Sequence, residues 1–353
     1  MVNRRRQNMI GLEGSGTEGR QWSDIPLDVL NIIAEQLDVV DQIYFRAVCK
    51  NWRQIQIVRP NKKLPWLMGL SWAFDENVYS VCSFYRPSAN QSYITYYNIF
   101  EREEFKVLRG AAICASKYGW LLLQKSSLSF FYNPYTKSII KLPDLDLSFN
   151  RTTFSSVPTS PDCFCCVIQS SKSNDKIYLS MCRPGDCQWS TLKLDGFRRA
   201  VVDVVYSNGT FYCVFSGGAL GAFCVADRHW SLLTNRELIS RDLFHSRAHM
   251  VESKGQLLLV CPSKFFEVFK FDCLAKTWLK INTLGCQALF LGCTSFSVSA
   301  EGDTLGFAER IYYHCELYSH YYSMETKQSD RCTFYPWDTK RGTERIWIQP
   351  PEI

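Results

Sequence analysis

The sequence lacks any long hydrophobic run. No stretch of about 18 uninterrupted apolar residues occurs in the 353 residues, so we expect no membrane-spanning helix and no membrane partner. The N-terminal stretch MVNRRRQNMIGLEGSGTEGRQ starts with basic residues but has no apolar segment of the kind found in a secretory signal. We therefore expect a protein of the nucleus or the cytoplasm, with residues 1–20 forming a disordered tail.

The sequence also lacks a concentration of charge of one sign. The net charge is only +6, and lysine and arginine are scattered apart from the run Arg4, Arg5 and Arg6. A protein that binds nucleic acid through its phosphates carries a basic stripe or a strongly basic domain. The sequence therefore predicts no nucleic-acid partner.

Metal-binding spacings are missing although cysteine is abundant. The chain has 16 cysteines, but the paired C-x2-C knuckles of a structural zinc site do not occur. The segment CFCC (Cys163, Cys165 and Cys166) alternates as a strand does, and CRPGDC (Cys182 and Cys187) stands alone. In a reducing compartment we expect most of these thiols to be small buried side chains. We expect no metal and no cofactor.

Catalytic motifs are absent as well. None of the five histidines stands in a recognisable catalytic context, and FSGGALG (residues 215–221) is followed by neither a helix nor the lysine of a phosphate loop. The acidic group Glu101, Glu103 and Glu104 is typical of a polar hairpin turn. We therefore expect a protein that is not an enzyme, although a site assembled from distant loops stays open as an alternative.

A short apolar segment near the N-terminus, residues 21–60, is helical in pattern. Pro26 suits the first turn of a helix, where its missing N–H costs nothing. Apolar residues then recur at helical spacing, namely Leu27, Leu30, Ile33, Ala34 and Leu37. Asp38 can cap a second helix, and Trp52 closes a third. Three such short helices have more apolar surface than they can bury among themselves, so we expect them either to dock on a partner or to cap the following domain.

The same segment resembles an F-box. It has the order Ile25-Pro26, an apolar helix, Asp41 in a second helix, and the signature Val48-Cys49-Lys50-Asn51-Trp52-Arg53. Isoleucine at position 25 replaces the more usual leucine. The resemblance implies docking onto a Skp1-type adaptor and, through it, onto a cullin-based ubiquitin ligase. The residues implied in adaptor binding are Ile25, Pro26, Leu27, Leu30, Ile33, Leu37, Val48, Cys49 and Trp52.

Residues 61–353 have the pattern of an all-β domain. Short runs rich in aromatic and β-branched residues are separated by turn residues. Similar hairpin-like segments recur at residues 130–142, 221–233 and 269–281, and Trp189, Trp230 and Trp278 mark equivalent places in the repeat. Glycines at positions 119, 209 and 255 precede apolar strands and lie 90 and 46 residues apart. A period of about 45 residues predicts four-stranded propeller blades, about six of them in this length. A pair of β-sandwiches is the alternative, because short strands with turn signals serve either fold.

This second part resembles the F-box-associated domain of plant proteins known as DUF295, a β-propeller-like domain. The resemblance lies in Pro65-Trp66-Leu67, in Ile311-Tyr312-Tyr313, and in Trp347 close to Pro350. The acidic run that often follows the Ile-Tyr-Phe motif is reduced here to Glu316. The resemblance implies a domain that recruits a target protein.

The sequence therefore predicts a two-domain α+β chain, a three-helix F-box followed by a six-bladed propeller. We expect it to be the substrate receptor of an SCF-type ubiquitin ligase, with an unknown protein as target. Two alternatives remain: a propeller scaffold outside any ligase, and a small-ligand-binding or hydrolytic propeller with a helical cap. The target, the propeller face that holds it and the need for a small molecule have no signature in the sequence.

Overall fold

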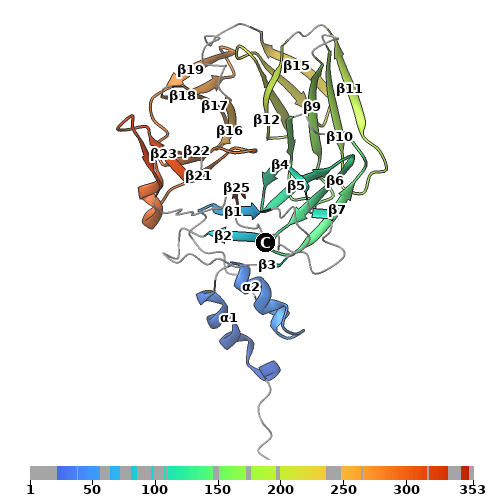
Figure 1. Cartoon of the computed structure of the whole chain (residues 1–353), viewed down its shortest axis with the longest axis vertical. Helices are drawn as coiled ribbons and strands as arrows, with labels where there is room; N and C mark the ends of the chain where they lie inside the picture. Colours follow the sequence, from blue (N-terminus) through green and yellow to red (C-terminus); the bar gives the residue numbers. More distant parts are fainter. Residues whose placement is uncertain are drawn as a thin grey trace, which may run out of the picture. The chain divides into compact units, whose positions relative to one another are not determined.

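The chain divides into two compact units, Met1–Pro60 and Asn61–Ile353. The computed structural model (Figure 1) describes residues 22–37, 39–55, 64–71, 81–85, 97–98, 107–108, 110–145, 151–171, 176–195, 199–235, 248–263, 265–315, 318–332 and 343–349. The disordered tail expected at residues 1–20 lies outside the described residues. In the described part, no helix combines the length and the hydropathy that crossing a membrane requires.

The described residues of the first unit form two α-helices rather than the expected three. Its elements are the 3-10 turn η1 (Trp22–Asp24), the helices α1 (Leu27–Gln36) and α2 (Val39–Arg46), and the 3-10 turn η2 (Trp52–Gln54). The third expected helix is only η2, because the backbone becomes extended at Ile55, whose N–H donates to the carbonyl of Trp52. A single 3-10 turn is a common way to end such a segment.

A small core holds the first unit together. It consists of Leu30, Ala34, Trp52 and Ile55, with Ile25, Phe45 and Cys49 packed against it. The rings of Phe45 and Trp52 have centroids 4.3 Å apart. The late tryptophan therefore joins the first helix to the second, which explains why a segment of this length needs it.

The second unit is made of β-sheets (Figure 1). In its described part, five sheets have four antiparallel strands each. In spatial order they are β25 (Thr343–Ile348), β1 (Trp66–Ser71), β2 (Val81–Tyr85), β3 (Tyr97–Asn98); β4 (Ala112–Lys117), β5 (Trp120–Lys125), β6 (Leu128–Asn133), β7 (Ser138–Leu142); β8 (Arg151–Phe154), β9 (Cys165–Ser171), β10 (Lys176–Cys182), β11 (Ser190–Asp195); β12 (Val201–Ser207), β13 (Thr210–Phe215), β14 (Leu220–Cys224), β15 (His229–Thr234); and β16 (His249–Ser253), β17 (Gln256–Pro262), β18 (Phe266–Asp272), β19 (Thr277–Ile281).

The remaining sheet departs from this pattern. Its order is β21 (Phe296–Ser299), β20 (Gln287–Phe290), β22 (Arg310–Cys315), β23 (Tyr318–Ser323), β24 (Ser329–Arg331), and β20 runs parallel to β22. A parallel pair needs a crossover connection, which β21 and the 3-10 helix η6 (Gly302–Phe307) supply. The expectation of six four-stranded blades is therefore wrong: five sheets are regular blades, and this one is five-stranded and mixed.

The sheets pack side by side in a ring. Strand β4 lies beside β25 and β8, strand β12 beside β8 and β16, and strand β21 beside β16. Apolar clusters fill the seams between successive sheets, and one of them joins the mixed sheet to the sheet of β1. The last strand, β25, pairs with the first, β1, from Trp66↔Ile348 to Ser71↔Thr343. The second unit is thus an all-β propeller, and the alternative of paired sandwiches is wrong.

The glycines that recur in the sequence sit in equivalent turns. In the pairs Tyr118-Gly119, Asn208-Gly209 and Lys254-Gly255 both residues have positive φ. Each pair is a two-residue hairpin between an inner strand and the next strand of its sheet. A hairpin of this kind requires positive φ at both positions, which glycine adopts without strain.

Candidate docking faces

The apolar side chains of the first unit fall into a buried and an exposed group. Of the positions implied in adaptor binding, Leu30 is fully buried and Trp52 is 8% exposed, so both serve the core of the unit itself. Ile25 and Cys49 pack against that core, and Leu37 is half-buried. The positions open to a partner are Pro26, Leu27, Ile33 and Val48.

Four exposed apolar residues of this unit were not among the predicted positions. Trp22 is 78% exposed and Ile32 is 62% exposed, and Val29 and Tyr44 are also exposed. A signal was available in the sequence, because α1 (LDVLNIIAEQ) is apolar on more than one face. The face that includes Leu30 and Ala34 is covered, so Val29, Ile32 and Ile33 remain for another molecule. We call the exposed residues the apolar set: Trp22, Leu27, Val29, Ile32, Ile33, Tyr44 and Val48.

Hydrogen bonds from η2 hold the N-terminal turn in place. Asn51 Nδ2 donates to the carbonyl of Ser23 at 2.8 Å, and Trp52 Nε1 donates to the carbonyl of Trp22 at 3.1 Å. At the end of α1, the buried Gln42 donates through Nε2 to the carbonyl of Leu37 at 2.8 Å. These bonds satisfy backbone carbonyls that helix ends leave unpaired, and they fix the position of the exposed Trp22.

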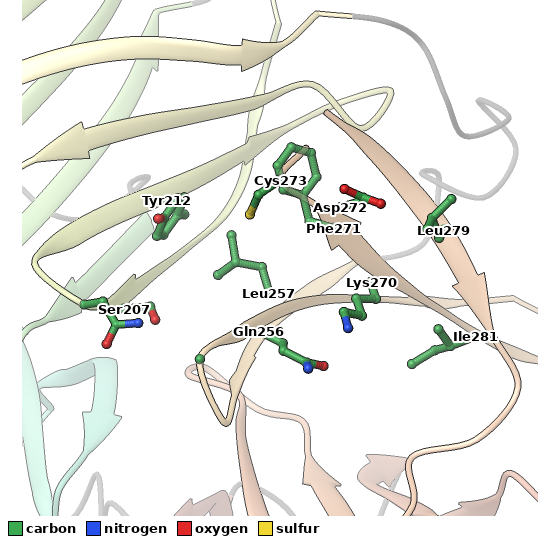
Figure 2. Close-up of a pocket in the computed structure, with 12 residues that line it drawn as sticks. Ser207, Tyr212, Gln256, Leu257, Lys270, Phe271, Asp272, Cys273, Leu279 and Ile281 are labelled. Atoms are coloured by element: carbon green, nitrogen blue, oxygen red, sulfur yellow. The ribbon is translucent and has the colours of Figure 1, made fainter. Parts of the chain in front are cut away.

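A cavity of about 410 Å³ lies in the propeller (Figure 2). It is bounded by the β12–β13 hairpin of one sheet and by β17, β18 and β19 of the next. Its lining mixes apolar, amide, hydroxyl and charged side chains. Volumes of this size accommodate a small ligand or a few side chains of a partner.

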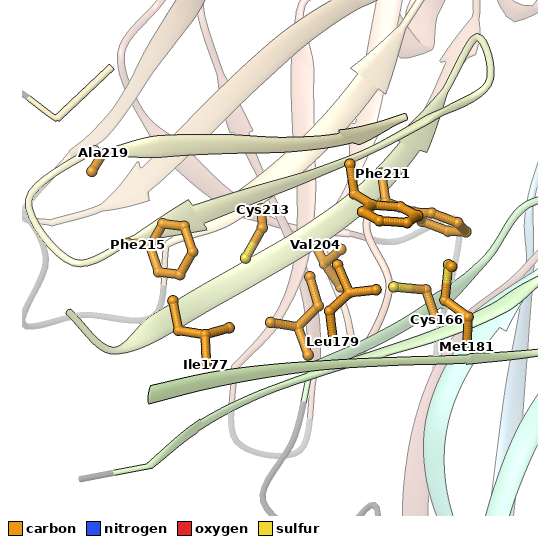
Figure 3. Close-up of a cluster of buried hydrophobic side chains, with 11 residues drawn as sticks. Cys166, Ile177, Leu179, Met181, Val204, Phe211, Cys213, Phe215 and Ala219 are labelled. Atoms are coloured by element: carbon orange, nitrogen blue, oxygen red, sulfur yellow. The ribbon is translucent and has the colours of Figure 1, made fainter. Parts of the chain in front are cut away.

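The buried cysteines fill the seams between sheets. Figure 3 shows Cys166 and Cys213 packed among apolar side chains between β9, β10 and β13. The fifteen cysteines whose side chains the structure describes are all free thiols. Burial raises the pKa of Cys165 and Cys213 well above its ordinary value and raises the pKa of Cys261 to about 12. Such thiols stay protonated and are poor nucleophiles.

Two serine–histidine pairs exist in the described residues. Ser295 Oγ lies 3.1 Å from His249 Nδ1, and Ser319 Oγ lies 3.2 Å from His314 Nδ1. The serines are only 5% and 1% exposed, so neither hydroxyl can be reached by a substrate from solvent. In the described part, no group of three or more His, Cys, Asp or Glu side chains could hold a metal ion.

Comparison with known proteins agrees with both units. The F-box domain family matches residues 22–63, and the KIB1-4 beta-propeller family matches residues 84–335. The Arabidopsis thaliana F-box/kelch-repeat protein At1g57790 is 30% identical over 94% of this chain and 95% of its own length. F-box protein At3g56470 of the same plant is 26% identical over 93% of this chain and 88% of its own length.

Among solved structures, the AfRom2 CNH domain covers 76% of this chain and 85% of its own length with a TM-score of 0.39 and 12% identity. The matches to the two families identify the chain, whereas the likeness to this solved structure does not. They confirm the resemblance to plant F-box proteins with an associated propeller. The chain belongs to the F-box proteins that carry a C-terminal β-propeller of the KIB1-4 type.

Proposed function

We propose that this protein is the substrate-receptor subunit of an SCF-type ubiquitin ligase. Its F-box docks on a Skp1-type adaptor and, through it, on a cullin, while its propeller recruits a target protein. The chain forms and breaks no bond itself. It raises the local concentration of target lysines beside a ubiquitin-charged enzyme, which is an effect of proximity.

The observation that carries the proposal is the apolar set of the first unit. Seven large apolar side chains are exposed on a unit whose own core is a cluster of only four buried residues. Burial of apolar surface contributes about 25 cal/mol per Å², and apolar surface concentrated in this way is typical of a site that binds another protein.

The test is co-purification of the full-length chain with a Skp1-type adaptor. Ile32→Asp and Val48→Asp should abolish binding, because each places a charge in an apolar contact. Leu305→Asp is the matched control: Leu305, in the propeller, is 62% exposed, as are Ile32 and Val48. Equal adaptor binding by all three variants, each with an unchanged circular dichroism spectrum, would contradict the proposal.

A further inference from the structure

The cavity of Figure 2 contains a lysine, Lys270, that forms no ion pair with any residue the structure describes. Lys270 and Asp272 lie two residues apart on β18, so they share one side of the strand. Asp272 is engaged locally, since its Oδ1 accepts hydrogen bonds from the N–H groups of Leu274 and Ala275 at 2.8 and 2.9 Å. The nearby Glu267 pairs with Lys280 instead. Among the described residues, none forms an ion pair or a hydrogen bond with the Lys270 ammonium.

Lys270 also departs from the propeller repeat. The equivalent residues, two places before the end of the third strand of their sheets, are Phe131 and Ala222, which are 0% and 7% exposed. Leu279 pairs directly with Lys270 across the strands and is 48% exposed. Its counterpart in the sheet of β4, Ile140, packs into a seam. This sheet therefore lacks an apolar pair that the sheet of β4 has, so a role in packing does not explain the lysine.

Exposed leucines and an edge strand lie beside the cavity. Leu274, at the tip of the β18–β19 turn, is 97% exposed and follows the lining residue Cys273. Strand β19 is the outermost strand of its sheet in the described structure. An edge strand can pair with an extended segment of another chain, and Gln256 and Tyr212 supply amide and hydroxyl groups in the cavity.

We propose that this cavity binds an extended peptide segment of the recruited protein in which acidic and apolar residues alternate. A carboxylate of the peptide pairs with Lys270, and its apolar side chains lie on Leu279 and Leu274. Charge complementarity selects this partner, because the cavity offers a half-buried ammonium that pairs with no anion among the described residues. The inference rests on the proposed receptor function only for the origin of the peptide.

The experiment measures fluorescence polarisation of a labelled peptide of alternating aspartate and leucine with the full-length chain, and adaptor binding is measured separately. We expect saturable binding that Lys270→Gln weakens about tenfold, as the loss of a charge-assisted hydrogen bond does. Lys276→Gln is the matched control, because this exposed lysine lies in the turn of the same sheet but does not line the cavity. It should bind the peptide as the wild type does.

Two further arms fix the chemistry. A peptide with asparagine in place of aspartate should bind the wild type about tenfold more weakly. Lys270→Glu should prefer a peptide of alternating lysine and leucine, which shows that the variant is folded. No saturable binding to the wild type, or equal losses in Lys270→Gln and Lys276→Gln, would overturn the proposal. Adaptor binding tests the receptor function independently of the cavity. If the chain binds the peptide but not the adaptor, the receptor function is refuted and the peptide site stands.

Discussion

The imidazole of His314 lies flat on the indole of Trp347, with ring centroids 4.5 Å apart and an interplanar angle of 16°. The contact joins β22 to β25, the C-terminal strand that closes the ring of sheets. Burial, and then the charges of Arg345 and His320, lower the pKa of His314 to about 3. The ring is therefore neutral in the native protein, and its protonation would place a charge in the seam at which the propeller closes.

This contact predicts acid sensitivity. Below about pH 6.5 the unfolded chain takes up a proton on this residue that the native state does not, so stability falls as the pH drops from about 6.5 toward 3. His314 contributes at most about 1.4 kcal/mol of unfolding free energy per pH unit to this loss. His314→Gln should lose stability less steeply than the wild type in urea denaturation at pH 7, 6 and 5. His229→Gln, at an exposed site, should follow the wild type; parallel curves for all three proteins would refute the role of His314.

Asp203 should affect the pH dependence of stability in the opposite direction to His314. Its two oxygens accept hydrogen bonds from the N–H groups of Val204 and of Met250 in the next sheet, both at 2.8 Å. Burial raises the pKa of Asp203 to about 6, although these hydrogen bonds and Arg151 oppose the rise. Between about pH 4 and 6 the native state thus binds more protons than the unfolded chain, so this group adds stability as the pH falls.

The Asp203→Ala variant tests both the hydrogen bonds of this carboxylate and its contribution to the pH dependence of stability. It should lose about 1–3 kcal/mol at pH 7, because two backbone donors lose their acceptor, and its loss of stability between pH 6 and 4 should be steeper than in the wild type. Asp227→Ala, at an exposed position, is the control. The free energy of unfolding is measured by urea denaturation over this pH range. If it falls less steeply with decreasing pH in Asp203→Ala than in the wild type, the prediction is wrong.

The ring of Trp230 leaves no room for a side chain at Gly221. A Cβ at this position would lie 2.3 Å from two ring atoms of Trp230, which is on the adjacent strand. A rigid ring cannot yield as a flexible chain can, so Gly221→Ala should cost about 1–3 kcal/mol of stability. Gly306→Ala meets no atom within 4 Å and should change the melting temperature little. Similar melting temperatures for both variants in differential scanning fluorimetry would disprove the predicted clash.

Two tryptophans of the F-box should respond differently. Trp52→Ala removes a side chain that is 8% exposed and should cost about 3–5 kcal/mol, enough to unfold this small unit. Trp22→Ala removes one that is 78% exposed and should leave the fold intact while weakening adaptor binding. Circular dichroism and adaptor titration of both variants test the difference. Unchanged adaptor affinity for Trp22→Ala would remove this residue from the docking face.

The local features of this protein were predictable because they depend on residues close together in the chain. Pro26 and the spacing of the following leucines were enough to place α1. The glycines at positions 119, 209 and 255 marked the inner hairpins, because only certain residues tolerate positive φ at both positions of such a turn. The indoles of Trp189 and Trp278 donate to the carbonyls of Pro143 and Gly218, which lie in connections after β7 and β13.

The features that were missed depend on contacts between residues far apart in the chain. Helix α1 is apolar on more than one face, and only the packing of Trp52 and Ile55 decides that Leu30 is buried and Ile32 exposed. The parallel pair of β20 and β22 has no periodic signal, since a crossover of 3-10 helix replaces a hairpin there. Lys270 is one scattered lysine in the sequence. It becomes a candidate binding residue because folding places it in a cavity, opposite the exposed Leu279.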